Sequence, residues 1–168
     1  MDGRSVALVA TGPVVIGYDG SDSADLAVHR AAELLAPRAA LVVTVWEAGA
    51  AFETAMLPTA TLGFVPAPLD FRGAMETDQA LYERAQRLAE RGSELARGLG
   101  FAAEGLAVAD DITVGDTLVR LATEKDAQAL VVGAHGHSAL GDVLLGHTSQ
   151  IVVRHAPCPV IVVRSPKR

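Results

Sequence analysis

Short runs of mostly apolar residues recur along this chain, separated by longer stretches in which apolar residues keep a helical spacing. The runs cover residues 14–19, 41–46, 103–108, 129–132 and 159–163. In the clearest of them, 41–46, Thr44 is the single polar residue, so the alternation typical of a half-solvated strand is missing. Strands buried on both faces have this pattern, and they are typical of parallel sheets covered by helices.

Four stretches repeat apolar residues three and four positions apart, which predicts helices. They cover residues 24–35, 81–99, 115–122 and 147–155. The serines in 20–23 offer an N-cap to the first helix, Pro37 ends it, and Gly100 ends the long second one. Strands that alternate with helices predict an α/β fold, an open parallel sheet with right-handed crossovers.

The 168 residues suffice for one domain with a hydrophobic core, which we expect to cover 13–166. Residues 1–12 form an N-terminal arm in this interpretation. From 47 to about 77 no periodicity persists, and prolines and glycines interrupt the segment. A loop of this length is a lid, a partner-contact segment or disordered, and we favour a mobile loop over an ordered lid.

Charge and composition narrow the class of partner. The formal net charge of −6 argues against a general binder of nucleic acid or of acidic membranes, because both need a basic face. No apolar run reaches the length of a membrane span, and the short apolar patch near the N-terminus does not resemble a signal sequence. Cys158 is the single cysteine, which favours a reducing compartment and a packed thiol. We therefore expect a cytoplasmic protein.

A strand, a glycine loop and a helix start follow one another near the C-terminus. Gly133 ends the apolar run 129–132, Gly136 follows, and Gly146 comes just before Thr148 and Ser149. Glycine lets backbone N–H groups approach an anion, and the first turn of a helix supplies unpaired N–H donors. This arrangement predicts a phosphate site. Ligands of open parallel sheets lie beyond the carboxyl ends of the strands, where strand order reverses.

The spacing Gly133-x2-Gly136-x9-Gly146 resembles that of the universal stress protein family. The flanking Leu-Val-Val and His-Ala-Pro-Cys-Pro-Val-Ile-Val-Val segments, and the opening Val-Ile-Gly-Tyr-Asp-Gly-Ser, resemble it too. The resemblance runs from about residue 14 to 164 and draws nothing from the loop 47–77. It implies a Rossmann-like sheet of five parallel strands in the order 3-2-1-4-5, with helices on both faces, in a protein that is usually dimeric.

Family members with the full glycine pattern bind ATP, so the resemblance implies an adenine-nucleotide site here. Carried over by position, one group lies near the ribose, the phosphates and the base, and a second holds the terminal phosphates. The first group is Gly17, Asp19, Val45, Gly133, Ala134, His135 and Gly136. The second is Gly146, His147, Thr148 and Ser149. His147 departs from the family pattern, which has Ser or Thr there; imidazole can donate a hydrogen bond to phosphate but is bulkier.

Two roles for Asp19 are both possible and do not exclude each other. It can cap the next helix, and it can orient ribose or hold Mg²⁺ through water. Trp46 is a packed core indole or a base-stacking platform. The histidines lack a recognised metal-ligand spacing, so we expect no protein-bound metal.

No base–nucleophile pair stands out, and the lysine of the P-loop is missing, so hydrolysis should be slow at most. The favoured function is an ATP-binding regulatory protein that forms a homodimer through its C-terminal strand. The alternative is a nucleotide-free dimeric interaction module of the same fold.

Overall fold

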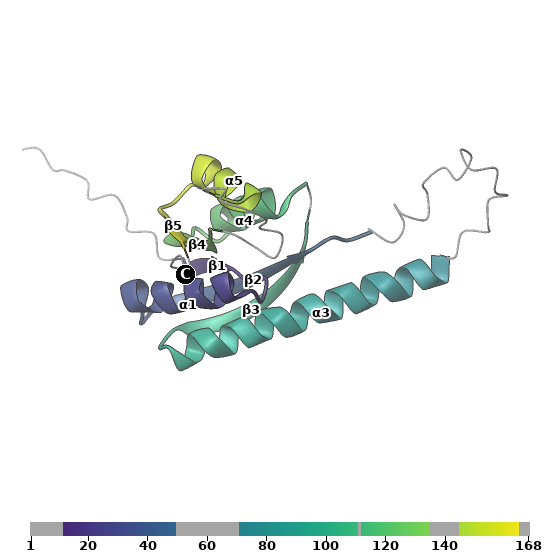
Figure 1. Ribbon diagram of the computed structural model, residues 1–168, viewed down its shortest axis with the longest axis horizontal. Helices are drawn as coiled ribbons and strands as arrows, with labels where there is room; N and C mark the ends of the chain where they lie inside the picture. The colour runs from purple at the N-terminus through teal and green to yellow at the C-terminus, as the bar shows by residue number, and fades with distance from the viewer. Residues whose placement is uncertain (1–11, 50–70, 111, 135–144, 165–168) are drawn as a thin grey trace, which may run out of the picture.

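Five parallel strands form one sheet in the order β3-β2-β1-β4-β5 (Figure 1). The computed structural model describes residues 12–49, 71–110, 112–134 and 145–164. The strands are β1 (Val14–Gly17), β2 (Ala39–Trp46), β3 (Ala102–Ala109), β4 (Ala129–Gly133) and β5 (Val160–Val163). The predicted α/β fold and strand order are confirmed. The proposed N-terminal arm lies almost wholly outside the described residues.

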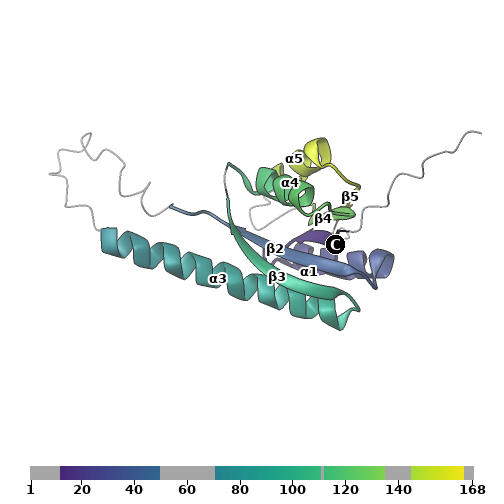
Figure 2. The ribbon, with the colours of Figure 1, turned by 180° about the vertical axis from the view of Figure 1, so that it is seen from behind.

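Helices cover both faces of the sheet. They are α1 (Asp22–Leu35), α3 (Phe71–Gly98), α4 (Val114–Glu124) and α5 (His147–His155). Helices α1 and α3 lie against one face and α4 and α5 against the other, in both the front and the back view (Figures 1 and 2). Each central strand is therefore buried on both sides, which explains the near-continuous apolar runs in the sequence.

Successive residues of the strands supply two separate cores. Val14 and Ile16 of β1 belong to the cluster beneath α1 and α3, whereas Val15 belongs to the cluster beneath α4. All three are fully buried. The same alternation continues along β2, where Val42 joins the first cluster and Val43 the second.

Small residues allow α3 to lie unusually close to the sheet. Ala89 and Ala96 of α3 are buried. A Cβ atom added to Gly105 of β3 would lie 2.7 Å from the backbone of Ala89, and one added to Gly92 would lie 2.8 Å from the ring of Tyr18. A side chain at either glycine would collide with the residue that faces it.

The expected loop over 47–77 is wrong in its last part, because α3 begins at Phe71. The helix was predicted from an apolar repeat that starts at residue 81. Asp78, one turn before it, is polar, so the repeat does not continue toward the N-terminus of α3. Residues 50–70 of the expected loop lie outside the described residues. The predicted starts of β2 and β3 are also one or two residues late.

Candidate functional site

A pocket of about 470 Å³ opens at the carboxyl ends of β1, β2 and β4. Strand order reverses here, because β2 lies on one side of β1 and β4 on the other. The chain leaves β1 for α1 and leaves β4 toward α5 on opposite faces of the sheet, so the two connections diverge and leave a crevice. We call this cavity the switch-point pocket. Its lining comprises Gly17, Tyr18, Asp19, Ser21, Ala24, Val43, Val45, Glu47, Val114, Leu118, Val132, Gly133 and Thr148.

Five residues singled out from the sequence meet in this lining. They are Gly17, Asp19, Val45, Gly133 and Thr148. They come from the ends of three strands and the first turn of α5, and the parallel register brings the strand ends to one edge of the sheet. His135 and Gly136 lie outside the described residues.

Asp19 shapes the turn between β1 and α1. Its Oδ1 atom accepts a hydrogen bond from the backbone N–H of Ser21 at 3.0 Å. Ser21 in turn is the N-cap of α1, and its hydroxyl accepts from the N–H of Ala24 at 3.2 Å. Gly20 between them has φ +78°, a conformation that suits glycine. The carboxylate of Asp19 is thus held at the pocket wall by the local turn.

The start of α5 closes another side of the pocket. Its N-cap is Gly146, which offers no side chain to the first-turn N–H groups. Thr148 lines the pocket, whereas His147 is exposed and is not among the lining residues. A helix start with a glycine cap leaves its N–H donors to an outside acceptor, and the helix dipole favours an anion there.

Ser149 and Ala134 connect the glycine segment to α5 from inside. The hydroxyl of Ser149 is buried and donates to the carbonyl oxygens of Gly146 at 2.9 Å and of Ala134 at 3.2 Å. The N–H of Gly146 donates to the same carbonyl of Ala134 at 2.8 Å. These three residues were predicted to contact the nucleotide; the structure gives Ser149 and Ala134 a positioning task, since both side chains are buried.

Gly133 has a packing reason for being glycine. A Cβ atom there would lie 2.6 Å from the hydroxyl oxygen of Ser23 in α1. The sequence interpretation had assigned this glycine to close approach of a phosphate alone. A side chain there would displace the Ser23 hydroxyl and would lie 3.3 Å from the Ser23 backbone, so α1 leaves little room at the end of β4.

Tyr18 is a lining residue that the sequence interpretation missed. Its hydroxyl donates to Asp25 Oδ1 of α1 at 2.5 Å, and Arg91 of α3 donates to Asp25 Oδ2 at 3.0 Å. Burial, followed by the hydrogen bond to Asp25, raises the pKa of Tyr18 to about 12. The tyrosine stands inside the quoted Val-Ile-Gly-Tyr-Asp motif, but nothing local indicated its partners on two helices.

The charged groups of the lining are acidic. Asp19 and Glu47 carry carboxylates, and the described lining contains neither lysine nor arginine. Glu47 follows β2 directly, so its place at the carboxyl edge was open to prediction. Among the described lining residues, the donors available to a phosphate are therefore backbone N–H groups and hydroxyls.

The described residues contain neither a metal cluster nor a membrane-spanning helix. Within the described ranges, no three His, Cys, Asp or Glu side chains gather in a way that could hold a metal ion. None of the described helices has the length and apolar character needed to cross a bilayer.

Cys158 packs beside the core of α4 and β4, and burial raises the pKa of its thiol.

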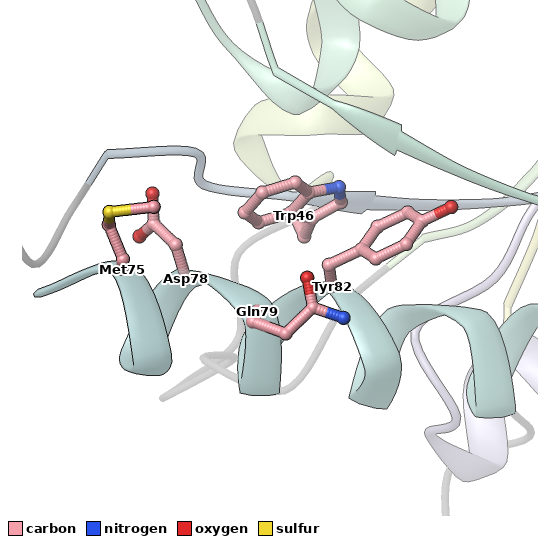
Figure 3. A pocket seen from close by; sticks show the side chains of 5 residues that line it. All are labelled: Trp46, Met75, Asp78, Gln79 and Tyr82. Atoms are coloured by element: carbon pink, nitrogen blue, oxygen red, sulfur yellow. The ribbon is translucent and has the colours of Figure 1, made fainter. Parts of the chain in front are cut away.

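Trp46 does not line the switch-point pocket. Val45 faces that pocket, and Trp46, the next residue of β2, faces α3 and contacts Tyr82 there (Figure 3). Its indole ring is half-buried and stands in a second cavity. Trp46 is therefore too exposed to be a core residue. Its indole also lies outside the switch-point pocket, next to which a base-stacking platform was one of the two hypotheses.

Comparison with known proteins agrees with this fold. The model of the universal stress protein family matches residues 11–164. A protein of Thermus aquaticus named "universal stress protein in QAH/OAS sulfhydrylase 3′ region" is 31% identical over 156 residues, which cover 90% of this chain and 97% of the relative.

Solved structures with a bound nucleotide are among the similar proteins. A universal stress protein in complex with cAMP is 26% identical, with a TM-score of 0.59 over 92% of this chain and 98% of the other. The Archaeoglobus fulgidus universal stress protein in complex with dAMP is 20% identical, with a TM-score of 0.61 and the same coverage of both chains.

Proposed function

The chain belongs to the universal stress protein family, and on that premise we propose that it binds an adenine nucleotide in the switch-point pocket as a regulatory ligand. The observation that carries this proposal is the meeting of Gly17, Asp19, Val45, Gly133 and Thr148 around one cavity. Relatives described in complex with cAMP and dAMP support the adenine class. ATP is the ligand that we favour.

We assign a distinct task to each part of the lining. Val43 and Val45 offer an apolar wall to the base, and the N–H groups at the start of α5, with the hydroxyl of Thr148, offer donors to phosphate. Asp19 and Glu47 repel a bare polyphosphate. Both carboxylates suit Mg²⁺, which binds through one or two carboxylates, phosphate oxygens and water. We therefore propose that ATP binds together with Mg²⁺.

The proposal does not include rapid catalysis. Ser149 is buried and donates to two carbonyl oxygens, so it is not placed as a nucleophile. A single-turnover assay with radiolabelled ATP should show little ADP or AMP over the time in which the nucleotide binds. We further propose a cytoplasmic protein, since a single cysteine excludes an intramolecular disulfide.

A second function is favoured by one observation. The two carboxylates in the lining, without a lysine or arginine among the described lining residues, suit a module that holds no nucleotide. Such a protein would act through its surface, as a dimeric interaction or signalling module.

Nucleotide content and binding separate the two functions. Acid extraction of the purified protein should release an adenine nucleotide, and ATP with Mg²⁺ should raise its melting temperature. Gly146→Val should abolish binding, because we expect a branched side chain at the N-cap to crowd the α5 N–H groups. The φ of −69° suits any residue, so the fold should survive.

Gly98→Ala is the matched control, since a Cβ atom there meets nothing within 4 Å. This variant should bind as the parent does. An empty protein that shows no thermal shift with millimolar ATP, AMP or cAMP would establish the nucleotide-free module instead. Retained binding in Gly146→Val would move the phosphate site elsewhere.

A further inference from the structure

A second cavity, of about 440 Å³, lies between the end of β2 and the first turns of α3. Trp46, Met75, Asp78, Gln79 and Tyr82 line it (Figure 3). We call it the α3 pocket. It is separate from the switch-point pocket, because Trp46 and Val45 point to opposite faces of β2.

The α3 pocket exists because α3 is longer than the strands that it covers. Its 28 residues span about 42 Å at 1.5 Å per residue. The eight residues of β2 and of β3 span only about 26 Å. The N-terminal part of α3 therefore extends past the sheet (Figure 1).

Side chains on α3 change in size where the sheet ends. Ala85 and Ala89 are buried where α3 lies over the strands. Toward the N-terminus of the helix, Tyr82, Asp78 and Met75 follow at the same helical spacing and line the cavity instead. Larger side chains take the place of the alanines where α3 passes the end of β2.

Two aromatic rings form one wall. The ring centroids of Trp46 and Tyr82 are 5.7 Å apart, with the planes inclined at 53°. The hydroxyl of Tyr82 accepts a hydrogen bond from Gln86 at 2.7 Å, which holds the phenol ring in place. The faces of aromatic rings carry partial negative charge, so a cation is attracted to them.

Asp78 supplies a full negative charge to the same cavity. Its Oδ2 atom accepts a hydrogen bond from the backbone N–H of Gly49 at 2.9 Å. Its Oδ1 atom is shielded from solvent, and the described part of the chain places no hydrogen-bond donor on it. A buried carboxylate oxygen without a donor is costly, and none of the five lining residues is Lys, Arg or His.

We propose that the α3 pocket binds a small organic cation of the alkylguanidinium class. The planar guanidinium group stacks on the Trp46 indole, and its positive charge faces the Asp78 carboxylate. Guanidinium fits better than a metal ion, because Mg²⁺ and Ca²⁺ require several oxygen ligands and this wall consists mainly of rings and a thioether. It fits better than an ammonium ion, because it is planar and more weakly hydrated.

Trp46 provides the readout, since it is the one tryptophan in the sequence. Butylguanidinium chloride is titrated into the full-length protein at constant ionic strength, with butylurea as the neutral ligand of nearly the same shape. We expect a saturable change in tryptophan fluorescence with butylguanidinium, half-complete at a concentration on the order of 1 mM, the weak affinity typical of a ligand this small. Butylurea should cause none.

Asp78→Asn tests the carboxylate. Asparagine keeps an oxygen that accepts from Gly49 N–H, so the fold should survive, while affinity for butylguanidinium falls at least tenfold. Glu76→Gln is the matched control, because it removes the same charge from an exposed residue of α3 outside the lining. Its affinity should match that of the parent.

The proposal is overturned by equal responses to butylguanidinium and butylurea, by the lack of a saturable response, or by unchanged affinity in Asp78→Asn. If Asp78→Asn does not fold, Tyr82→Leu takes its place and should weaken binding severalfold; unchanged affinity there counts against the site. The nucleotide proposal is unaffected by any of these results, since it concerns the other face of β2.

Discussion

Tyr18 connects the switch-point pocket to two helices through a single side chain. It is only 3% exposed, and its hydroxyl reaches Asp25 of α1, which also binds Arg91 of α3. Its carbonyl oxygen accepts from the hydroxyl of Thr44, the polar residue within β2. Thr44 thus satisfies the backbone where β1 ends, which explains a hydroxyl in an otherwise apolar strand.

The hydroxyl of Tyr18 should make stability depend on alkaline pH. The folded protein holds the phenol proton up to a pKa of about 12, whereas the unfolded chain releases it near pH 10. The unfolded state therefore binds fewer protons between these values, and stability falls as pH rises through them, by up to about 1.4 kcal/mol per pH unit. Below pH 10 this contribution is fully present.

Urea unfolding of the parent and of Tyr18→Phe, at several pH values from about 8 to 11, measures the effect. The variant lacks the titrating group, so the stability advantage of the parent should be constant at first and shrink above pH 10. A difference that stays constant over the whole range would show that folding does not raise the pKa of Tyr18.

At the scale of elements, the close packing of α3 on the sheet depends on glycines, which have no side chain at the contact. Gly105 of β3 lies against the backbone of Ala89, and Gly92 of α3 lies against Tyr18 and Val42. The same helix that contacts the sheet so closely at its C-terminal end forms an open cavity with Trp46 at its N-terminal end. The C-terminal half of α3 therefore packs against the sheet, and its N-terminal half forms one side of the α3 pocket.

Gly105→Ala should destabilise the protein by about 1–3 kcal/mol, the usual cost of forcing a methyl group into a packed interface. Its Cβ atom would lie 2.7 Å from backbone atoms of Ala89, which cannot rotate away as a side chain can. Thermal unfolding measures the loss. Gly98→Ala, at the open end of α3, should show no loss, and a similar destabilisation of both variants would contradict the close contact.

At the scale of the whole molecule, β5 forms one edge of the sheet, and we propose that it pairs with its twin in a homodimer. The carbonyl oxygens of Pro159 and Val163 accept hydrogen bonds from the backbone N–H groups of Leu130 and Ala134. The alternation along a strand then turns the N–H and carbonyl groups of Val160 and Val162 away from β4, toward the outer edge.

Val162→Pro tests this edge. Proline removes an outward N–H group and leaves the hydrogen bonds to β4 in place, so the dimer should dissociate while the protomer stays folded. Light scattering should then fall from twice 17.4 kDa to 17.4 kDa. Leu34→Ser, which removes an exposed apolar side chain from α1, serves as control and should remain dimeric. A dimeric Val162→Pro would place the interface elsewhere.

Much of the fold could be predicted because its signals are local. The apolar run 41–46 and the helical repeat ending at Pro37 each reflect burial of nearby residues, and the family motif then implied the strand order. The candidate site could be predicted in part for the same reason. Gly17, Asp19 and Gly133 stand at strand ends, and parallel strands bring their carboxyl ends to one edge.

The sequence by itself therefore determined the class of fold, the order of its elements and the edge of the sheet at which a ligand belongs. Only the tertiary structure decided which residue crowds Gly133, that Ser149 is buried, and that Trp46 faces α3. Each of these depends on atoms from another element: Ser23 of α1, the carbonyl of Ala134, and Tyr82 of α3. Periodicity records how deeply a residue is buried, but the neighbour it is buried against is set by how the helices cross the sheet.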